Sequence, residues 1–372
     1  MLEHRTVSDI QKLRSFGKSW ETLRKMCKGP AYQSFDWTSM WLKHFGNLAS
    51  PRLILVNDGE DIVGILPLVQ TVTTLMGMRL KRLSFFGNCS STAESYDHEL
   101  LCVGNQDEVL DQVIEALREL NWNLLQLCDL RDTSLSTTLC ERIAEEWQTD
   151  EIPKIPCPRA YLPTTGNVID IIGSRTRRTI RHVISSLKDE KRIVHRIEES
   201  PDGVAEAMRT YAALHRDRWE KRGGSIFSDE NISSFLIDIA RKFAETSSGR
   251  VYEIRIDGTV ASQLFCIDDW ECMRAYRIGM NDSMKEFSPG NLVAYFAMQD
   301  AQKRGFGHLD FGKGAEEFKY RMGAKDTYLV GVEAKKGSLR IMSKIASLPG
   351  VKGAVERTGV KDSALKKMYE KT

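Results

Sequence analysis

The sequence lacks the patterns that mark membrane, secreted and metal-binding proteins. No run of about 18 consecutive apolar residues occurs, so no membrane span is expected. The N-terminal residues alternate charged and apolar side chains and lack the continuous apolar segment of a secretory signal. The cysteines form no CxxC pair and the histidines form no HxxxH or HExxH motif, which argues against a metal site. We therefore expect a cytoplasmic protein with buried, reduced thiols and no metal.

The net charge of +2 creates no global field that would favour nucleic acid. Basic residues outnumber acidic ones in two places, residues 173–196 and residues 335–372. Either segment could meet a phosphorylated acceptor, an acidic polysaccharide precursor or the inner face of an anionic membrane. The alternative is that both are ordinary solvated helix faces.

The same order of elements occurs twice along the chain. In the first half, strand-like runs at 51–56 and 61–70 flank Asp58-Gly59, and in the second half runs at 250–256 and 259–267 flank Asp257-Gly258. Both pairs predict a β-hairpin, because an Asp-Gly turn readily adopts positive φ angles. The first hairpin is followed by strands at 78–87 and 98–103, a helix at 106–120, a strand at 122–130 and a helix at 134–147. The second is followed by a strand at 272–280, a helix at 289–304, a strand at 308–312, a helix at 315–322 and a strand at 327–334.

This repetition predicts an α/β (α+β) protein with two tandem domains, each a mostly antiparallel mixed sheet flanked by helices. The predicted domains are residues 1–165 and 166–335, followed by a basic helical tail at 336–372. Helices within 7–45 and 175–222 precede the two sheets. The proline-rich stretch 151–166 is interpreted as the crossing between the domains.

A glycine-rich loop after the strand at 308–312 is the first candidate for chemistry. Asp310 lies at the end of that strand, where it could accept a proton or orient an attacking group. Gly312 and Gly314 allow a ligand to approach the backbone closely. Lys319 follows on the next helix, as a compact cation for a phosphate or carboxylate. The alternative for Lys319 is a solvated lysine on an amphipathic helix.

A second candidate lies on the helix that contains ALHRDRW. Three- and four-residue steps place Tyr211, His215 and Arg218 on one face of that helix. Arg218 could hold an anionic substrate group with two parallel hydrogen bonds, and His215 could act as a base. The alternative is that Arg218 pairs with a nearby carboxylate and the helix face packs in the core.

Several segments together resemble a known family. They are QSFDWTSMW, GILPLV, LSFFGN and SYDHELL in the first half, and TRRTIRHVISSL, ALHRDRW, DGTVASQLF and DFGKGAEEFKYRMGA in the second. In this order they are similar to the CelD/BioF-type acetyltransferases, a family of the GNAT superfamily that resembles the Fem-type peptidyltransferases. The resemblance covers about residues 35–334.

The resemblance implies a tandem GNAT fold and several site residues. In that fold the phosphates of acyl-CoA rest at the start of the helix at 289–304, which implies Ser288, Gly290 and Asn291 as cofactor-binding residues. Ser288 also has the features of an N-cap before Pro289, so an ordinary capped helix start is the alternative. The strand at 272–280 lines the acyl pocket in that fold, and Tyr276 would serve in catalysis with Asp310. By motif position Lys319 belongs to the substrate region, and Arg218 matches an Arg-Trp pair of the family pattern. Together with Gly312 and Gly314 of the glycine-rich loop, they are the expected acceptor-binding residues.

The expected function is transfer of an acyl group from a thioester, acyl-CoA, to an amine or hydroxyl of a sugar-containing or lipid-linked acceptor. One alternative is a Fem-like transferase that uses charged tRNA, the single case in which nucleic acid would be a partner. Another is a degenerate GNAT pair with a non-catalytic role in envelope-polysaccharide assembly.

Overall fold

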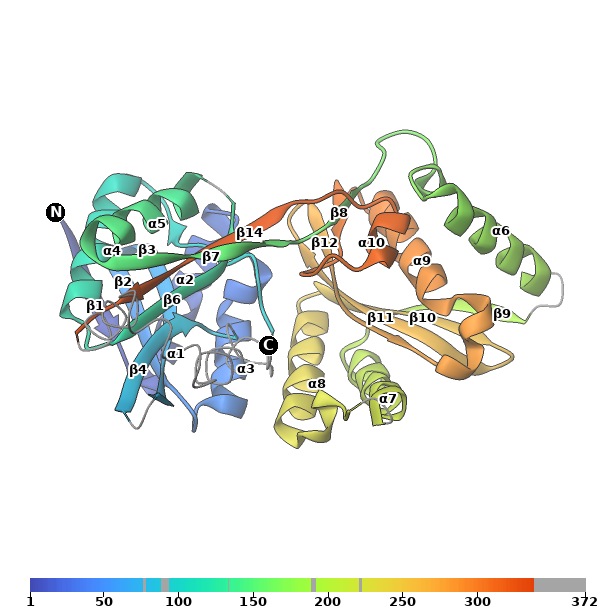
Figure 1. The fold of residues 1–372 in the computed structure, drawn as a ribbon, viewed down its shortest axis with the longest axis horizontal. Helices are drawn as coiled ribbons and strands as arrows, with labels where there is room; N and C mark the ends of the chain where they lie inside the picture. Colours follow the sequence, from blue (N-terminus) through green and yellow to red (C-terminus); the bar gives the residue numbers. More distant parts are fainter. Residues whose placement is uncertain (76–77, 88–93, 133, 189–191, 221–222, 338–372) are drawn as a thin grey trace, which may run out of the picture. The chain divides into compact units, whose positions relative to one another are not determined.

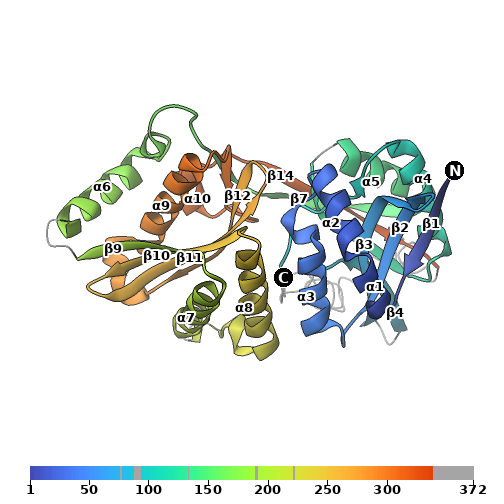
Figure 2. The ribbon, with the colours of Figure 1, turned by 180° about the vertical axis from the view of Figure 1, so that it is seen from behind.

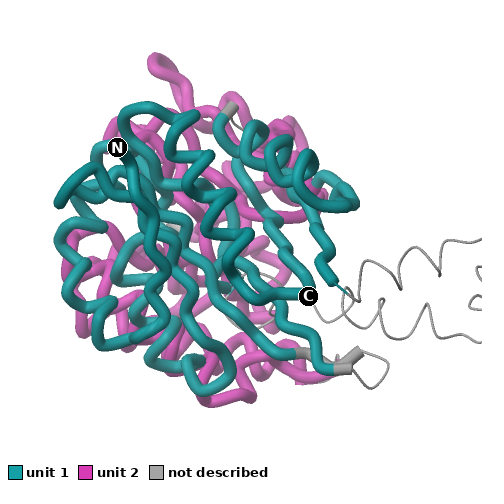
Figure 3. The backbone as a smooth tube through the Cα atoms, turned by 90° about the vertical axis from the view of Figure 1, so that its left-hand side faces the viewer, with its two compact units in different colours: residues 1–154, 329–372 teal, residues 155–328 magenta. Residues whose placement is uncertain are grey.

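The computed structural model describes residues 1–337 except 76–77, 88–93, 133, 189–191 and 221–222. The chain forms two compact units (Figure 3). Unit 1 consists of residues 1–154 and 329–372, and unit 2 of residues 155–328. The predicted domains at 1–165 and 166–335 differ from these units because segments near residues 155 and 329 belong to the sheet of the other half.

Unit 1 contains an eight-stranded sheet in the order β1-β2-β3-β4-β6-β14-β7, with β5 paired to β3. Helices α4 and α5 cover one face, and α1, α2 and α3 cover the other (Figures 1 and 2). Its elements are β1 Leu2–Val7, α1 Ile10–Ser15, α2 Gly17–Met26, η1 Ala31–Gln33, α3 Phe35–Phe45, β2 Ser50–Asp58, β3 Asp61–Leu75, β4 Met78–Phe85, β5 Leu101–Cys102, α4 Gln106–Glu119, β6 Leu124–Arg131, α5 Ser134–Glu146, β7 Gln148–Pro156 and β14 Tyr328–Lys335.

Unit 2 contains a six-stranded sheet in the order β8-β13-β12-β11-β10-β9. Helices α6, α9 and α10 lie on one face and α7 and α8 on the other, as both Figure 1 and Figure 2 show. Its elements are β8 Arg159–Tyr161, η2 Val168–Asp170, α6 Ser174–Lys188, β9 Ile193–Glu198, α7 Pro201–Trp219, η4 Ile226–Ser228, α8 Glu230–Glu245, β10 Gly249–Ile256, β11 Thr259–Asp269, β12 Cys272–Met280, η5 Asp282–Phe287, α9 Pro289–Lys303, β13 His308–Asp310 and α10 Glu317–Arg321.

The two predicted hairpins are confirmed. Asp257 and Gly258 have φ angles of 50° and 76°, and they join β10 to β11 with Ile256 opposite Thr259. Gly59, with φ 58°, turns β2 into β3. The antiparallel pairs are held by apolar side chains on both faces of each sheet. In unit 2, for example, Leu264 and Cys266 of β11 pack in one core with residues of α6 and α9.

Each unit receives a strand from the other half of the sequence. Strand β14 follows α10 in the chain, yet it pairs antiparallel with β6 of unit 1, with Val332 opposite Leu127. Strand β8 follows β7, yet it pairs antiparallel with β13 of unit 2, with Ala160 opposite Leu309. The last strand of each repeat therefore completes the sheet of the other repeat.

The proline-rich stretch 151–166 crosses from unit 1, which ends at Lys154, to unit 2, which begins at Ile155, in agreement with its interpretation as the crossing. It also contains the end of β7 and all of β8, because prolines are tolerated where a strand needs no N–H for the ladder. The stretch 175–222 is not wholly helical, because β9 interrupts it and pairs with β10. The predicted tail helix lies, from residue 338 on, outside the described residues. Within the described part of the chain, no helix combines the length and apolar composition that a membrane span requires.

The strand exchange predicts that the two halves do not fold alone. A fragment of residues 1–165 lacks β14, and a fragment of residues 166–372 lacks β8, so each would expose an unpaired sheet edge that favours aggregation. We expect each fragment alone to be insoluble or to melt without cooperativity, and the two fragments produced together to form a 1:1 complex. Size-exclusion chromatography and circular dichroism measure both outcomes. A soluble, cooperatively melting 166–372 fragment would contradict the prediction.

Candidate functional site

In unit 2 the two central parallel strands separate part of the way along their length. Strand β12 pairs with β13 only from Cys272 to Arg274, opposite His308 to Asp310. Beyond this point β12 continues to Met280, whereas the chain after Asp310 turns into the loop before α10. Among the described residues, β13 pairs with this edge of β12 only as far as Arg274, and α9 begins near the far end of β12.

The corresponding opening in unit 1 is closed by the chain itself. Strands β4 and β6 pair from Arg82 to Ser84, opposite Leu124 to Gln126. Beyond these pairs, His98 takes the place of a continued β4: its N–H donates to the Asp129 carbonyl at 2.8 Å, and its carbonyl accepts from the Arg131 N–H at 3.0 Å. Both described parallel pairs thus diverge, and only that of unit 1 is filled by a segment of its own chain.

A β-bulge at Tyr276 sets the direction of the side chains along β12. Phe265 pairs with Arg277 and Cys266 with Ala275, so Tyr276 is the extra residue of the bulge. Regular strand alternation would place Tyr276 and Arg277 on opposite faces, and the bulge brings them to the same face. The Tyr276 and Phe265 rings lie 6.2 Å apart, and the Arg277 guanidinium lies 4.3 Å from the centre of the Tyr276 ring. Both side chains point to the face that α7 covers.

The start of α9 differs from the predicted cap. Ser288 has φ and ψ of 50°, and its hydroxyl caps no N–H of the helix. Its own N–H instead donates to the Lys285 carbonyl, and its carbonyl accepts from Asn291. A Cβ atom on Gly290 would lie 2.3 Å from the Met280 sulfur, so the glycine lets α9 begin directly against the end of β12. The structure thus places the start of α9, with Ser288, Gly290 and Asn291, at the end of β12, and their role in cofactor binding stays a prediction.

Asp310 lies in a fully buried ionic network. Its carboxylate accepts from Arg159 Nε at 3.0 Å and from the Gly312 N–H at 2.7 Å, and it lies 3.7 Å from an Arg274 Nη1. The Cys157 thiol approaches it at 3.5 Å. A carboxylate with these partners ties β8, β12 and β13 together. This geometry favours a positioning role over the predicted proton transfer.

Lys319 is also buried, with its side chain 4% exposed. Its Nζ donates to the carbonyls of Gly312, Lys313 and Gly314 at 3.0, 2.7 and 3.0 Å. Its fourth contact is an ion pair with Glu316 at 2.7 Å. Lys319 therefore binds the loop that it was expected to face, and its ammonium has three protein carbonyls as acceptors. The alternative of a solvated lysine is excluded, and a contact of Lys319 with substrate stays a prediction.

The face of α7 brings the second candidate group against β12. Tyr211 packs on Gly279, where an added Cβ would lie 2.7 Å from the Tyr211 ring. Burial raises the pKa of Tyr211 to about 12. Burial, with the positive charges of Arg277 and Arg218, lowers the pKa of His215 to about 4, so this imidazole is neutral at physiological pH.

The partners in two contacts of this cluster could not be identified from the sequence. Arg218 Nε lies 3.2 Å from an Asp282 carboxylate oxygen on η5, and His215 Nδ1 lies 2.7 Å from the Ser225 hydroxyl. The predicted alternative of an ion pair for Arg218 is therefore confirmed. Arg277 joins the same cluster because the bulge turns it toward α7, a displacement that strand periodicity does not reveal.

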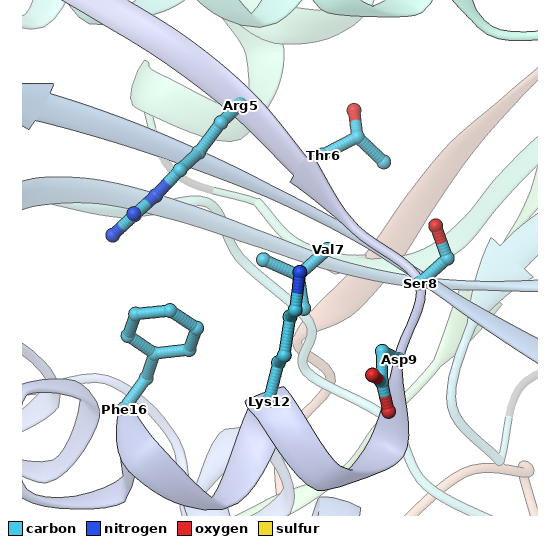
Figure 4. Close-up of a pocket in the computed structure, with 7 residues that line it drawn as sticks. All are labelled: Arg5, Thr6, Val7, Ser8, Asp9, Lys12 and Phe16. Carbon is cyan, nitrogen blue, oxygen red and sulfur yellow. The ribbon is translucent and has the colours of Figure 1, made fainter.

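A surface hollow of about 420 Å³ lies elsewhere, in unit 1, between β1 and α1 (Figure 4). Its groups have structural roles: Arg5 lies 4.7 Å from the centre of the Phe16 ring, and Asp9 accepts the Gln11 N–H at the start of α1. The hollow contains none of the predicted site residues. Its lining consists of Arg5, Thr6, Val7, Ser8, Asp9, Lys12 and Phe16.

Comparison with known families places a recognised domain in unit 2. The profile of the acetyltransferase (GNAT) domain family matches residues 174–320, which span α6 to α10. No match was found among curated proteins. Unit 2 thus contains a GNAT-type domain, and the element order of unit 1 repeats its plan.

Solved structures resemble the chain over nearly its whole length. FemX superposes with a TM-score of 0.59 at 12% identity, covering 92% of this chain and 99% of FemX. A protein of unknown function from Bacteroides thetaiotaomicron VPI-5482 gives 0.57 at 11% identity, over 90% and 100% of the two chains. The C-terminal domain of an Agrobacterium fabrum protein named as a lysylphosphatidylglycerol synthetase gives 0.53 at 10% identity, over 91% and 98%. At these identities the likeness establishes a shared fold.

The buried position of Lys319 leads to a stability prediction. Lys319→Met removes the ammonium that donates to the carbonyls of Gly312, Lys313 and Gly314. We therefore expect the free energy of unfolding to fall by about 3 kcal/mol. Lys325→Met, an exposed lysine of the same unit, is the matched control and should change it by less than about 0.5 kcal/mol. Denaturant titration measures both. If Lys319→Met keeps wild-type stability and only weakens substrate binding, the loop-binding role is wrong and the substrate role is favoured.

Proposed function

We propose that the protein is an acyltransferase that moves an acyl group from a thioester, acyl-CoA, to an amine or hydroxyl of a sugar-containing acceptor. The observation that carries this proposal is the opening between β12 and β13 next to the start of α9 in unit 2. The backbone edge of β12 offers hydrogen-bonding groups to an extended thioester arm, and the helix start offers a positive dipole end to phosphates. The GNAT profile over residues 174–320 supports the same reaction class.

Unit 2 is the proposed donor site, and unit 1 is not. In unit 1 the segment around His98 already uses the hydrogen-bonding groups of Asp129 and Arg131 on β6. An acyl-CoA arm would have to displace that segment, which Asp97 anchors further by two hydrogen bonds to Arg131 at 3.1 Å each. We therefore propose one donor site per chain.

The acceptor approaches from the face covered by α7 in this proposal. Tyr276, Arg277, His215 and Arg218 lie there, beside the bulge that turns the β12 backbone. The protein would contribute mainly position: it holds the acceptor nucleophile near the thioester carbonyl and offers hydrogen-bond donors to the oxygen that becomes negative. The acceptor attacks directly and the thiol departs. Tyr276 and neutral His215 are the groups placed to exchange a proton with the acceptor, while Asp310 positions the strands.

The finer assignment rests on the motifs of the sequence. We propose a CelD/BioF-type enzyme that acts in exopolysaccharide or cell-envelope synthesis, in the cytoplasm, with its basic tail as a contact to the inner membrane face. A lipid-linked acceptor would fit that location.

The alternative donor is a charged tRNA, as in a Fem-like aminoacyl transferase. The observation that favours it is the exposed basic face of α6, with Arg175, Arg178 and Arg181. Binding of tRNA to this face would weaken steeply with rising salt, whereas acyl-CoA binding at the opening of β12 would depend on it far less.

The start of α9 provides a sharp test. Asn291→Asp places a negative charge in the first turn of α9. There it interacts favourably with the helix dipole, so the helix is not destabilised, but it repels a phosphate. We expect wild-type protein to bind acetyl-CoA with a stoichiometry of one, and the variant to bind at least about tenfold more weakly at unchanged melting temperature, a loss of about 1.4 kcal/mol. Asn231→Asp makes the same change in the first turn of α8 and should leave binding unaltered. Isothermal titration calorimetry and thermal shift measure these values.

Two outcomes would contradict the proposal in different ways. Absence of binding by acetyl-CoA, longer acyl-CoAs and free CoA at millimolar concentration refutes the acyl-CoA donor. A stoichiometry of two refutes the assignment of the donor to unit 2 alone.

A further inference from the structure

Two arginines from different elements meet beneath the bulge of β12. Arg277 comes from β12, and its guanidinium lies over the Tyr276 ring with an Nη2 3.4 Å from the Tyr276 hydroxyl. Arg218 comes from α7, and its side chain is 25% exposed. Arg218 forms an ion pair with Asp282 of η5, whose side chain is 43% exposed, so this pair lies at the surface of the cluster. Each arginine thus borders the face of β12 where the acceptor is proposed to bind.

The positive charges of two arginines act on this point. Arg277 and Arg218 add to the effect of burial that lowers the pKa of His215, and they oppose the rise that burial causes in the pKa of Tyr211. His215 itself remains neutral there, and Tyr211 remains a phenol. The guanidinium groups of Arg218 and Arg277 thus lie close to uncharged hydrogen-bonding groups, and Asp282 lies beside Arg218.

Two partly exposed apolar side chains border the same cluster. Trp219 is 38% exposed, and its ring stacks on His215 with centroids 5.8 Å apart and an angle of 21°. Ile226 of η4 is 39% exposed. A flat exposed indole beside cations offers a surface for the face of a sugar ring whose substituent reaches the arginines.

We infer that the acceptor carries a negatively charged group, a carboxylate or a phosphate, which Arg218 and Arg277 hold while Trp219 contacts its ring. This inference rests on the proposed acyl transfer and names the acceptor as an acidic sugar. Arginine suits the task because its planar guanidinium can donate two parallel hydrogen bonds to either anion and stays charged at any pH of interest. The bound anion would compete with Asp282 for Arg218, so η5 and its neighbour α9 would respond to the acceptor.

Binding of simple probes tests the inference on the full-length protein. The probes are glucosamine, glucosamine 6-phosphate and glucosaminuronate, each titrated by calorimetry with and without acetyl-CoA. We expect at least one acidic probe to bind about ten- to a hundredfold more tightly than glucosamine, as expected for one or two charge-assisted hydrogen bonds. The two acidic probes distinguish a phosphate from a carboxylate.

Matched variants connect the preference to the two arginines. Arg218→Gln and Arg277→Gln should each reduce affinity for the preferred acidic probe about tenfold or more, while affinity for glucosamine changes little. Arg209→Gln, on the same helix and 55% exposed in a pair with Glu206, is the control and should behave as wild type. Arg277→Lys keeps the charge and should retain part of the preference. If a glutamine variant fails to fold, the preference of the wild-type protein for acidic over neutral probes still tests the inference.

Equal affinity for acidic and neutral probes, or no binding of any of them at ten millimolar, would overturn the inference. So would an acidic preference that survives in both glutamine variants. The donor titration is independent: if acetyl-CoA fails to bind but the acidic preference depends on Arg218 and Arg277, the proposed donor is wrong and the anion site stands. If acetyl-CoA binds and the preference is absent, the proposed function stands and the acidic acceptor is wrong.

Discussion

Hydrogen bonding at the parallel pair of central strands is the constraint on which the rest of this structure depends. When two parallel strands diverge, the backbone groups between them need other partners, because buried N–H and C=O groups are rarely left unpaired. Both repeats contain such a divergence. Unit 1 fills it with the segment around His98, which pairs with the backbone of β6. In the described part of unit 2, the pairing of the two parallel strands ends at Arg274 and Asp310, and no further strand continues it. The same fold can therefore hold a substrate in one repeat and a piece of its own chain in the other.

An opening between strands is useful only if its borders are fixed, and in unit 2 buried ions fix them. Asp310 joins Arg159 of β8 and Arg274 of β12 at the point where the strands separate. Lys319 gathers three carbonyls of the loop that follows. Isolated buried charges are costly, and pairs of them are retained where they specify one arrangement. Strand β8 is an imported strand, so the geometry of the opening depends on the exchange between the repeats.

Local sequence patterns correctly predicted the two hairpins and the start of α9. The Asp-Gly turns at Gly59 and Gly258 identified both hairpins, and helix α9 begins at Pro289 as predicted. The strand exchange could not be predicted, because β14 has the same alternating pattern whichever sheet it joins. The bulge at Tyr276 has no sequence signal either, and it places Tyr276 and Arg277 on the same face of β12. Charged side chains such as Lys319 are usually exposed, so its burial among carbonyls contradicts the ordinary expectation for its residue type.

The positive charges on the α7 face also affect the protonation of an amine acceptor. An amine acceptor must lose its proton before it can attack a thioester, and a positive environment lowers the pKa of an ammonium group as it lowers that of His215. The two arginines that would attract an acidic acceptor by its anionic group would thus disfavour the protonated form of its amine. Because His215 is neutral and Tyr211 stays protonated, neither adds a charge that cancels this effect. Arg218 and Arg277 would then both recognise the anion and activate the neighbouring amine. Water would suffice as the final acceptor of the proton that the amine loses.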